Sequence, residues 1–373
     1  MNQTKRLFAI ILAFVFAIMA VVPMAMAQEN CNGFERRDRH FSISPEDTEF
    51  MRSQLVALGL YGDGFLTEPL YDVNGEITFL LGTSECGFVI ISRPDGILYE
   101  WGGVSPFTGF EACKKYYAGA MSYYVKNIYD NAFYNLMTAA VEESPTLRLI
   151  ESPSQRGGVF DDPQPTPSKW TISNPQYITQ YAFGYNSEGT CSAVAAGIAL
   201  NYLKRQYGLP VTINIMTPEP FYSTEGFPSN YSSWNSLYPK AETLHQKLLH
   251  YCVNGWSINE PLNRYFTDWI SDPAKRPIAF YDRNYKSFEN IKQYILSNRP
   301  IIVCTYKHSM VAYGCRKVVS NNGTTYSVLV HTGWHIPDWF NQNTAVNRYE
   351  HIEHYVNVNT LRALYSFILP SGC

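Results

Sequence analysis

The sequence predicts an α+β fold whose second half begins with a helical portion and continues with antiparallel strands. Residues 191–206 are rich in small apolar side chains, a pattern typical of a buried helix. Apolar, partly β-branched runs predict strands at residues 301–305, 310–318 and 326–330. An Asn-Asn-Gly run at 321–323 favours a hairpin turn between the last two strands. A helix followed by antiparallel strands is typical of the α+β class.

The beginning of the chain has the features of a secretory signal peptide. Lys5 and Arg6 precede an apolar run at residues 7–22, and Ala-Met-Ala at 25–27 resembles a cleavage site. The run is short for a bilayer-spanning helix, which needs about 20 residues. We therefore expect cleavage after residue 27 rather than a membrane anchor. The mature protein is then secreted, or associated with the cell envelope, and has no stable membrane span.

Composition favours a folded protein with two domains. The chain has 373 residues, of which 46% are hydrophobic and 16% charged, with a net charge of −3. This charge balance indicates no nucleic-acid partner. The eight cysteines of an exported chain predict disulfides. We expect one pair among Cys31, Cys86 and Cys113, and buried thiols at Cys304 and Cys315.

A segment rich in Pro and Gly, residues 151–168, divides the chain and is typical of an exposed linker that proteases cut. The expected order is a signal peptide, a first domain, this linker with an activation cleavage, and a second domain, at residues 1–27, 28–150, 151–168 and 169–373. The first domain shows no catalytic constellation. Its pattern predicts two strands, a turn, a returning antiparallel strand and a helix, at residues 77–82, 87–92, 93–96, 97–101 and 113–141.

The second domain carries the candidate chemistry. We expect a loop-rich, aromatic middle at residues 209–283 and a short helix at 287–297 that ends before Pro300. Cys191 opens the Ala-rich helix, where a thiol faces the positive end of the helix dipole, which favours the thiolate. His308 stands at the start of the 310–318 strand. A Cys on a helix start and a distant His on a sheet predict a nucleophile with its general base and acid.

Two further roles have several candidates. Gln180 and Asn186 precede the nucleophile and are candidate side-chain donors of an oxyanion hole, with Gln176 a weaker one. The group that orients the second ring nitrogen of His308 is predicted to be His331 first and Asp338 second. Each of these residues also has a purely structural interpretation, as a polar loop residue or a core histidine.

The motifs resemble those of the papain-like clan of cysteine peptidases, and within it the streptopain-type secreted bacterial peptidases and related families. The first resemblance is Gln180, Tyr185-Asn186, and Cys191 opening an Ala-rich helix. The second is Pro300 followed by His308 and a run to Gly314, and the third is the Gly333-Trp334 pair. Residues 86–91 and 101–107 resemble the propeptides of such enzymes.

This resemblance implies a papain-like catalytic domain, in which the Cys helix packs on the antiparallel sheet bearing the His, preceded by a small α+β pro-domain. It also implies a zymogen whose propeptide, residues 28–150, inhibits the catalytic domain. The chain departs from the family at His331, which stands where the family has Asn before Gly-Trp. This departure leaves two alternatives, a triad completed by His331 or a Cys-His dyad. The double Cys-Pro pattern before the streptopain nucleophile is absent, so the resemblance is to the broader clan.

We therefore expect a secreted cysteine endopeptidase that hydrolyses peptides or proteins through a Cys-His thiolate–imidazolium pair and a thioester acyl-enzyme. Two alternatives stay open: a transglutaminase-like acyl transferase using the same dyad, and a non-catalytic binding protein on a peptidase scaffold. No cofactor is expected. A metal site is not expected either, because the His245/His250 and His351/His354 pairs lack further candidate ligands.

Overall fold

The computed structural model describes residues 31, 33–37, 42–137, 141–147, 168–179, 191–210, 257–320, 323–333 and 353–371. The expected signal peptide and most of the expected linker lie outside these residues. Among the described residues, no helix has the length and apolar character needed to cross a membrane. The elements of the N-terminal half are α2 (Pro45–Leu58), β1 (Leu66–Tyr71), β2 (Ile77–Ser84), β3 (Gly87–Ser92), β4 (Leu98–Gly102), β5 (Lys115–Tyr117), β6 (Tyr123–Lys126), β7 (Phe133–Asn135) and β8 (Val141–Glu142).

In the C-terminal half, helices and strands lie before and after a long β-hairpin. Its elements are β9 (Ser168–Thr171), α3 (Gln176–Thr179), α4 (Cys191–Tyr207), α7 (Asn259–Trp269), the 3-10 helix η1 (Pro273–Lys275), β10 (Ile278–Tyr281), α8 (Phe288–Leu296), β11 (Ile301–Cys304), β12 (Ser309–Ser320), β13 (Gly323–His331), β14 (His354–Asn357), the 3-10 helix η2 (Val358–Thr360) and β15 (Ala363–Ile368).

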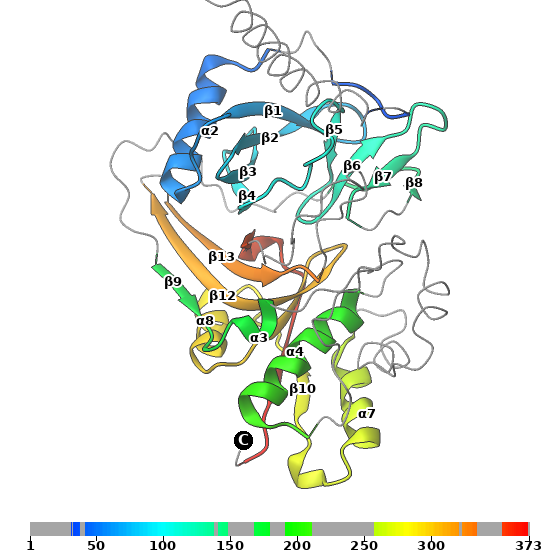
Figure 1. Cartoon of the computed structure of the whole chain (residues 1–373), viewed down its shortest axis with the longest axis vertical. Coiled ribbons are helices and arrows are strands. Elements are labelled where there is room, and N and C mark those ends of the chain that lie inside the picture. Colours follow the sequence, from blue (N-terminus) through cyan, green and yellow to red (C-terminus); the bar gives the residue numbers. More distant parts are fainter. Residues whose placement is uncertain are drawn as a thin grey trace, which may run out of the picture.

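The described strands form one 15-stranded sheet in the order β10-β15-β11-β12-β13-β14-β4-β3-β2-β1-β5-β6-β7-β8, with β9 paired to β12. The pairing is antiparallel except between β1 and β5. Helix α2 packs against β2 and β3, whereas α4 packs against β11 and β12 and α8 against β9 and β12. Figure 1 shows the N-terminal strands and α2 above the C-terminal helices. This mixed architecture with a large, mostly antiparallel sheet confirms the α+β class.

Most strands predicted in the first half are present. β2, β3 and β4 cover the predicted runs, and the turn between β3 and β4 has Gly96 at φ 67°. The helix predicted at 113–141 is wrong, because this segment forms β5, β6 and β7 and ends at the start of β8. Its tyrosines favour pleated, half-buried surfaces. Gly119 at φ 114° and Met121 at φ 64° turn the chain between β5 and β6, which a continuous helix cannot accommodate.

Predictions for the second half hold for the elements with clear local signals. α4 matches the predicted helix, and α8 begins after Ser287, whose Oγ accepts from the Asn290 amide at 3.3 Å. β11, β12 and β13 match the predicted strands, and Ser320 pairs with Gly323 across the predicted hairpin turn. The loop-rich middle is corrected where it is described, because residues 259–281 contain α7, η1 and β10. β9, β14 and β15 were not predicted.

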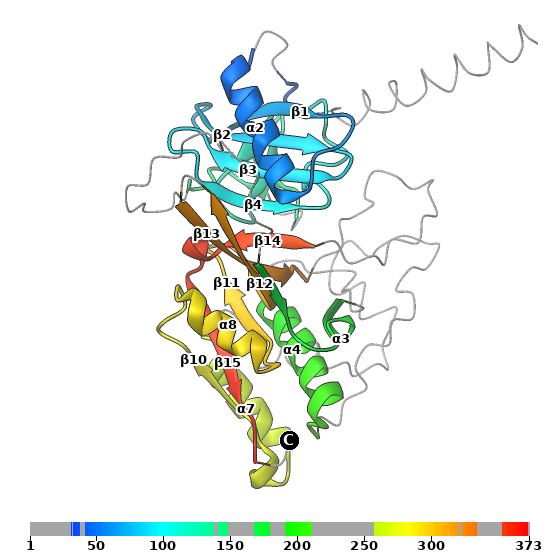
Figure 2. The ribbon, with the colours of Figure 1, turned by 90° about the vertical axis from the view of Figure 1, so that its left-hand side faces the viewer.

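The sheet continues across the expected domain boundary at a seam formed by β4 and β14. His354, Tyr355 and Val356 pair with Gly102, Trp101 and Glu100. The rings of Trp101 and Tyr355 stack with centroids 5.0 Å apart. A Cβ at Gly102 would lie 2.6 Å from the Glu353 carbonyl oxygen, so the close approach of the two strands requires glycine there. Figure 2 shows β14 beside β4, where the two halves meet.

The seam is centred on the buried carboxylate of Glu100, which has no solvent exposure. Its Oε1 accepts from Tyr117 Oη at 2.5 Å and from the Met121 amide at 3.0 Å. Its Oε2 accepts from Tyr123 Oη and, at 2.9 Å, from His354 Nε2. Burial next to this carboxylate raises the pKa of both tyrosines well above their usual value. The phenols therefore remain neutral donors, and the carboxylate joins groups from both halves.

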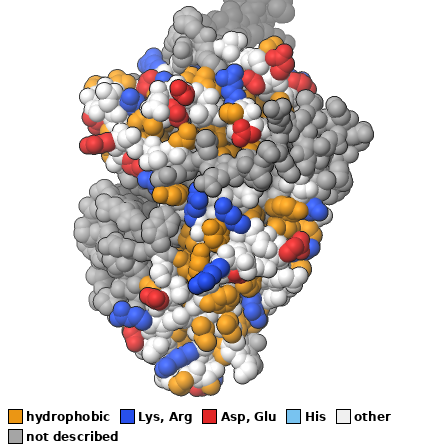
Figure 3. All heavy atoms as spheres, turned by 180° about the vertical axis from the view of Figure 1, so that it is seen from behind, with side chains coloured by type: hydrophobic (Ala, Val, Ile, Leu, Met, Phe, Trp, Pro, Cys, Tyr) orange, Lys and Arg blue, Asp and Glu red, His pale blue; other side chains and the backbone are white. Residues whose placement is uncertain are grey.

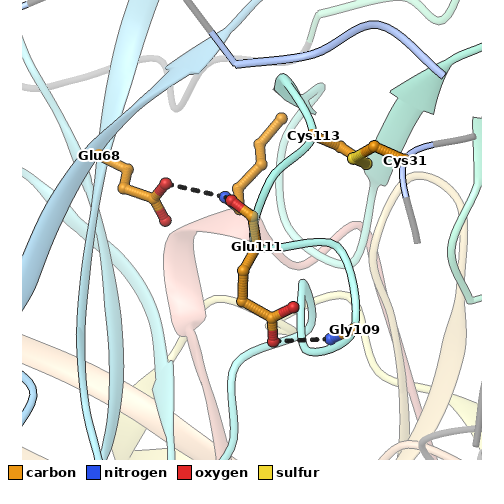
Figure 4. Close-up of a disulfide and its surroundings, with 6 residues drawn as sticks. Cys31, Glu68, Gly109, Glu111 and Cys113 are labelled. Carbon is orange, nitrogen blue, oxygen red and sulfur yellow. Dashed lines mark hydrogen bonds and ion pairs between the residues drawn. A yellow bond between two sulfur atoms is a disulfide. The ribbon is translucent and has the colours of Figure 1, made fainter. Parts of the chain in front are cut away.

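A disulfide closes the N-terminal half. Cys31 and Cys113 are bonded and buried, whereas Cys86 is free and exposed. Close to it, the amide of Gly109 donates to Glu111 Oε1 at 2.8 Å, and Lys115 Nζ donates to Glu68 Oε1 at 2.9 Å (Figure 4). The structure thus confirms the expectation of one pair among the three early cysteines. It also confirms buried free thiols at Cys304 and Cys315.

Apolar side chains reach the surface where the sheet ends at β10. Ile278 of β10 pairs with Ile368 of β15, and these side chains are 53% and 50% exposed. Figure 3 shows apolar side chains among Lys and Arg on the lower part of the molecule's rear face. The solvent-exposed surface at the β10 edge of the sheet is therefore partly apolar.

We expect Glu100→Ala to lower the free energy of unfolding by about 3–5 kcal/mol, because it leaves buried donors without their acceptor. Urea denaturation of the full chain measures this change. Glu85→Ala is the matched control, because Glu85 is exposed in the turn between β2 and β3, and we expect it to change stability by less than about 0.5 kcal/mol. Equal effects of the two substitutions would contradict a central role for Glu100.

Candidate active site

Cys191 is the first residue of α4, and this end of the helix lies against the start of β12. It is a free cysteine of intermediate exposure. From Ala193 to Leu203 the helix is buried, so its position against β11 and β12 is fixed by packing. The small side chains of this stretch let the helix approach the strands closely. The helix therefore holds the Cys191 thiol at a defined place at the edge of the core.

His308 directly precedes β12 and is 3% exposed. The turn from β11 to β12 holds its backbone, since the Thr305 amide donates to the His308 carbonyl at 2.8 Å. Its Nε2 lies 2.5 Å from the carbonyl oxygen of Thr332, just beyond β13. A carbonyl oxygen can only accept, so Nε2 carries a hydrogen and donates it. In the neutral ring the lone pair is then on Nδ1, the atom that can act as a base.

The surroundings of His308 hold its ring neutral. Burial lowers its pKa to about 3, with a smaller contribution from the positive charge that His354 can carry, while the Thr332 carbonyl opposes the shift. Near pH 7 the ring is therefore an imidazole. A thiolate–imidazolium pair at Cys191 and His308 requires a more solvated state of His308 than the one in this structure.

The residues next to Cys191 and His308 in sequence are in direct contact. Ser192 Oγ and Ser309 Oγ lie 3.1 Å apart, and Ser309 Oγ also lies 3.2 Å from the sulfur of Cys304. Burial raises the pKa of Cys304 to about 12, the hydrogen bond with Ser309 opposes this shift, and a negative charge on the nearby Cys191 sulfur adds to it. The helix start bearing Cys191 and the strand start bearing His308 are thus brought to the same place in the fold.

His331 ends β13 and is 4% exposed. Its Nδ1 accepts from the Gly333 amide at 2.9 Å, so in a neutral ring the hydrogen is on Nε2. The group hydrogen-bonded to His308 Nε2 is the neighbouring Thr332 carbonyl. The orienting role of His331 stays a prediction, while the structure offers a backbone carbonyl for this role.

The other candidate residues are not assembled with the pair in the described part of the chain. Gln180, Asn186 and Asp338 lie outside the described residues. Gln176 begins α3, is exposed, and donates from Nε2 to Asn174 Oδ1 at 3.3 Å. The oxyanion-hole assignments therefore stay predictions.

Charges from the N-terminal half lie close to the site. Lys307, the residue before His308, donates to Glu142 Oε2 of β8 at 2.9 Å. His354, which depresses the pKa of His308, is paired with Glu100 of β4. Within the described ranges, no group of three or more His, Cys, Asp or Glu side chains could hold a metal ion.

Sequence reasoning did not identify Ser192, Ser309, Cys304 and Thr332 as parts of the site. Ser192 and Ser309 directly follow the two candidate catalytic residues, and this shared position in the sequence could have identified them as parts of the site. Cys304 was predicted as a core thiol without a relation to Cys191. Thr332 contributes a backbone carbonyl, for which no side-chain pattern exists.

The low pKa of His308 predicts a loss of stability in acid. The unfolded chain takes up a proton near pH 6.5 that the folded chain refuses down to about pH 3. The free energy of unfolding should therefore fall as pH drops through this window, by up to about 1.4 kcal/mol per pH unit from this residue. Urea denaturation between about pH 7 and pH 4 measures it in the wild type and in His308→Gln. Identical pH slopes in the two proteins would contradict the prediction.

Comparison of the chain with protein-family models gives no match. Comparisons with curated proteins and with solved structures give no match either. The motifs of the sequence and the geometry around Cys191 and His308 are therefore the basis on which a function is proposed.

Proposed function

We propose that the chain is a secreted cysteine endopeptidase of the papain-like clan, made as a zymogen. The observation that carries this proposal is the contact between Ser192 and Ser309, which brings the helix start at Cys191 to the strand start at His308. Packing of a Cys-bearing helix on an antiparallel sheet that presents a His is the arrangement that the sequence resemblance implies. The same resemblance supports the assignment of the N-terminal half as a propeptide.

The reaction follows from the two side chains. Nδ1 of His308 takes the proton of the Cys191 thiol as the sulfur attacks the carbonyl carbon of a peptide bond. The resulting imidazolium donates this proton to the leaving amine, and a thioester acyl-enzyme remains. His308 then removes a proton from water, whose oxygen attacks the thioester. As the acid is released, the imidazolium returns this proton to the Cys191 sulfur, which restores the thiol and the neutral ring. The Thr332 carbonyl keeps the hydrogen on Nε2 throughout, so that Nδ1 is the atom that exchanges protons.

The state of His308 supports latency of the intact chain. Its ring is buried and neutral, next to groups that the N-terminal half holds in place through the Lys307–Glu142 and His354–Glu100 pairs. A loosening of these contacts would admit water to the ring and raise its pKa toward the ordinary value. Cleavage in residues 151–168 followed by movement of the N-terminal half is the activation step that we propose.

Cys191→Ala and His308→Ala should each lower peptide hydrolysis at least about 1,000-fold, because the two groups act as one unit. The assay uses a fluorogenic peptide library and the secreted protein after activation. Cys86→Ala is the matched control, since Cys86 is free, exposed and in the N-terminal half, and it should retain full activity. Full activity in Cys191→Ala would refute the peptidase assignment. Products that incorporate an added primary amine in place of water would favour the acyl-transferase alternative.

Limited proteolysis within residues 151–168 should raise activity at least about tenfold over the intact chain, because the rate follows the fraction of competent molecules. The nick is mapped by mass spectrometry, and both forms are assayed at equal concentrations of chain. The control is the same protease treatment of Cys191→Ala, which should show no increase. Equal activity of intact and nicked chains would contradict a zymogen.

A further inference from the structure

Three small side chains connect the helix of Cys191 with the strand of His308. Ser309 Oγ lies 3.1 Å from Ser192 Oγ and 3.2 Å from Cys304 Sγ. Ser309 is 7% exposed and Cys304 is 4% exposed. The connection is therefore largely shielded from water, which otherwise competes for hydrogen bonds of this kind.

The position of the three residues follows from the antiparallel pairing of β11 with β12 and from the packing of α4 on these strands. Cys304 and Ser309 are paired directly across β11 and β12, so their side chains lie on the same face of the sheet. Ser192 is in the first turn of α4, which packs against these two strands. The chain of contacts therefore runs from one strand to the next and then to the helix.

The protonation states allow a continuous hydrogen-bond chain. Cys304 stays a protonated thiol near neutral pH, because burial raises its pKa to about 12. Its S–H can donate to Ser309 Oγ, and the Ser309 hydroxyl can then donate to Ser192 Oγ. The opposite direction is equally balanced, because each link needs one hydrogen and each hydroxyl can both donate and accept. A buried Cys304 thiol of this kind is a poor second nucleophile.

We propose that Ser192, Ser309 and Cys304 form a positioning bridge that sets the separation of Cys191 and His308. Each serine is the next residue after one of the two, so a hydrogen bond between the serines constrains both backbones at the site. Proton transfer from sulfur to nitrogen depends steeply on this separation. The inference rests on the proposed function, and the serines act through their neighbours rather than on the substrate.

The test is a double-mutant cycle with Ser192→Ala and Ser309→Ala in the full chain, both intact and nicked within residues 151–168. Activity is split into kcat and KM, and the alkylation rate of Cys191 by iodoacetamide is followed against pH by peptide mapping. Exposed Cys86 is the internal reference for an ordinary thiol. Ser327→Ala is the matched control, since Ser327 is fully buried on β13 and its hydroxyl has no hydrogen-bond partner among the described residues.

We expect kcat of each serine variant to be about tenfold lower than that of the wild type, with KM nearly unchanged. The rate at which iodoacetamide alkylates Cys191 should fall by a similar factor across the pH range. The double variant should lose no more than either single one, because both substitutions remove the same bond. Ser192→Thr keeps a hydroxyl at this half-buried site, so its kcat and its Cys191 alkylation rate should be close to those of the wild type. Ser327→Ala should behave as the wild type, which separates the bridge from a general effect of deleting a buried hydroxyl.

The bridge is refuted if both serine variants keep the wild-type kcat and alkylation profile, or if their losses multiply in the double variant. This outcome differs from failure of the peptidase assignment, which would appear as full activity in Cys191→Ala. In that event the alkylation profiles still decide the bridge, because they report the environment of the Cys191 thiol without requiring hydrolysis.

Discussion

A carboxylate without solvent exposure has to receive hydrogen bonds at both oxygens. The donors to Glu100 come from both halves of the chain, and the joining of the two halves depends on this interaction. Tyr117 and Tyr123 come from the hairpin of β5 and β6, whereas His354 comes from the far end of the chain. The hydrogen bond between Glu100 and His354 therefore stabilises the pairing of β14 with β4, through which the strands of both halves form one sheet. These donors come from both halves of the chain, so the hydrogen bonds of the buried carboxylate are complete only when β14 and β4 are paired.

The same residue that completes the seam also affects the candidate site. His354 pairs with Glu100 on one side, and its charge contributes to the low pKa of His308 on the other. β14 also pairs with β13, which ends one residue before the carbonyl that binds His308 Nε2. The joining of the halves and the neutral state of His308 are therefore connected through a short set of contacts. This connection is the physical basis of the latency that we propose for the intact chain.

Much of the architecture could be predicted from local signals. The Ala-rich pattern predicted α4, the amphipathic pattern before Pro300 predicted α8, and the Asn-Asn-Gly run predicted the hairpin of β12 and β13. The segment at 113–141 was mistaken for a helix because its aromatic side chains can occupy either structure. Its pairing and its contacts with Glu100, which lie outside any local window, decide for strands.

The sequence by itself determined the class of the fold, the main helix and hairpin, and the positions of Cys191 and His308 at the starts of their elements. These features depend on side-chain size, turn chemistry and periodicity over a few residues. Only the tertiary structure decided that β14 joins β4, that the Thr332 carbonyl orients His308, and that Ser192 meets Ser309. Such contacts join residues distant in the chain, and the neutrality of His308 depends on how completely the fold removes it from water.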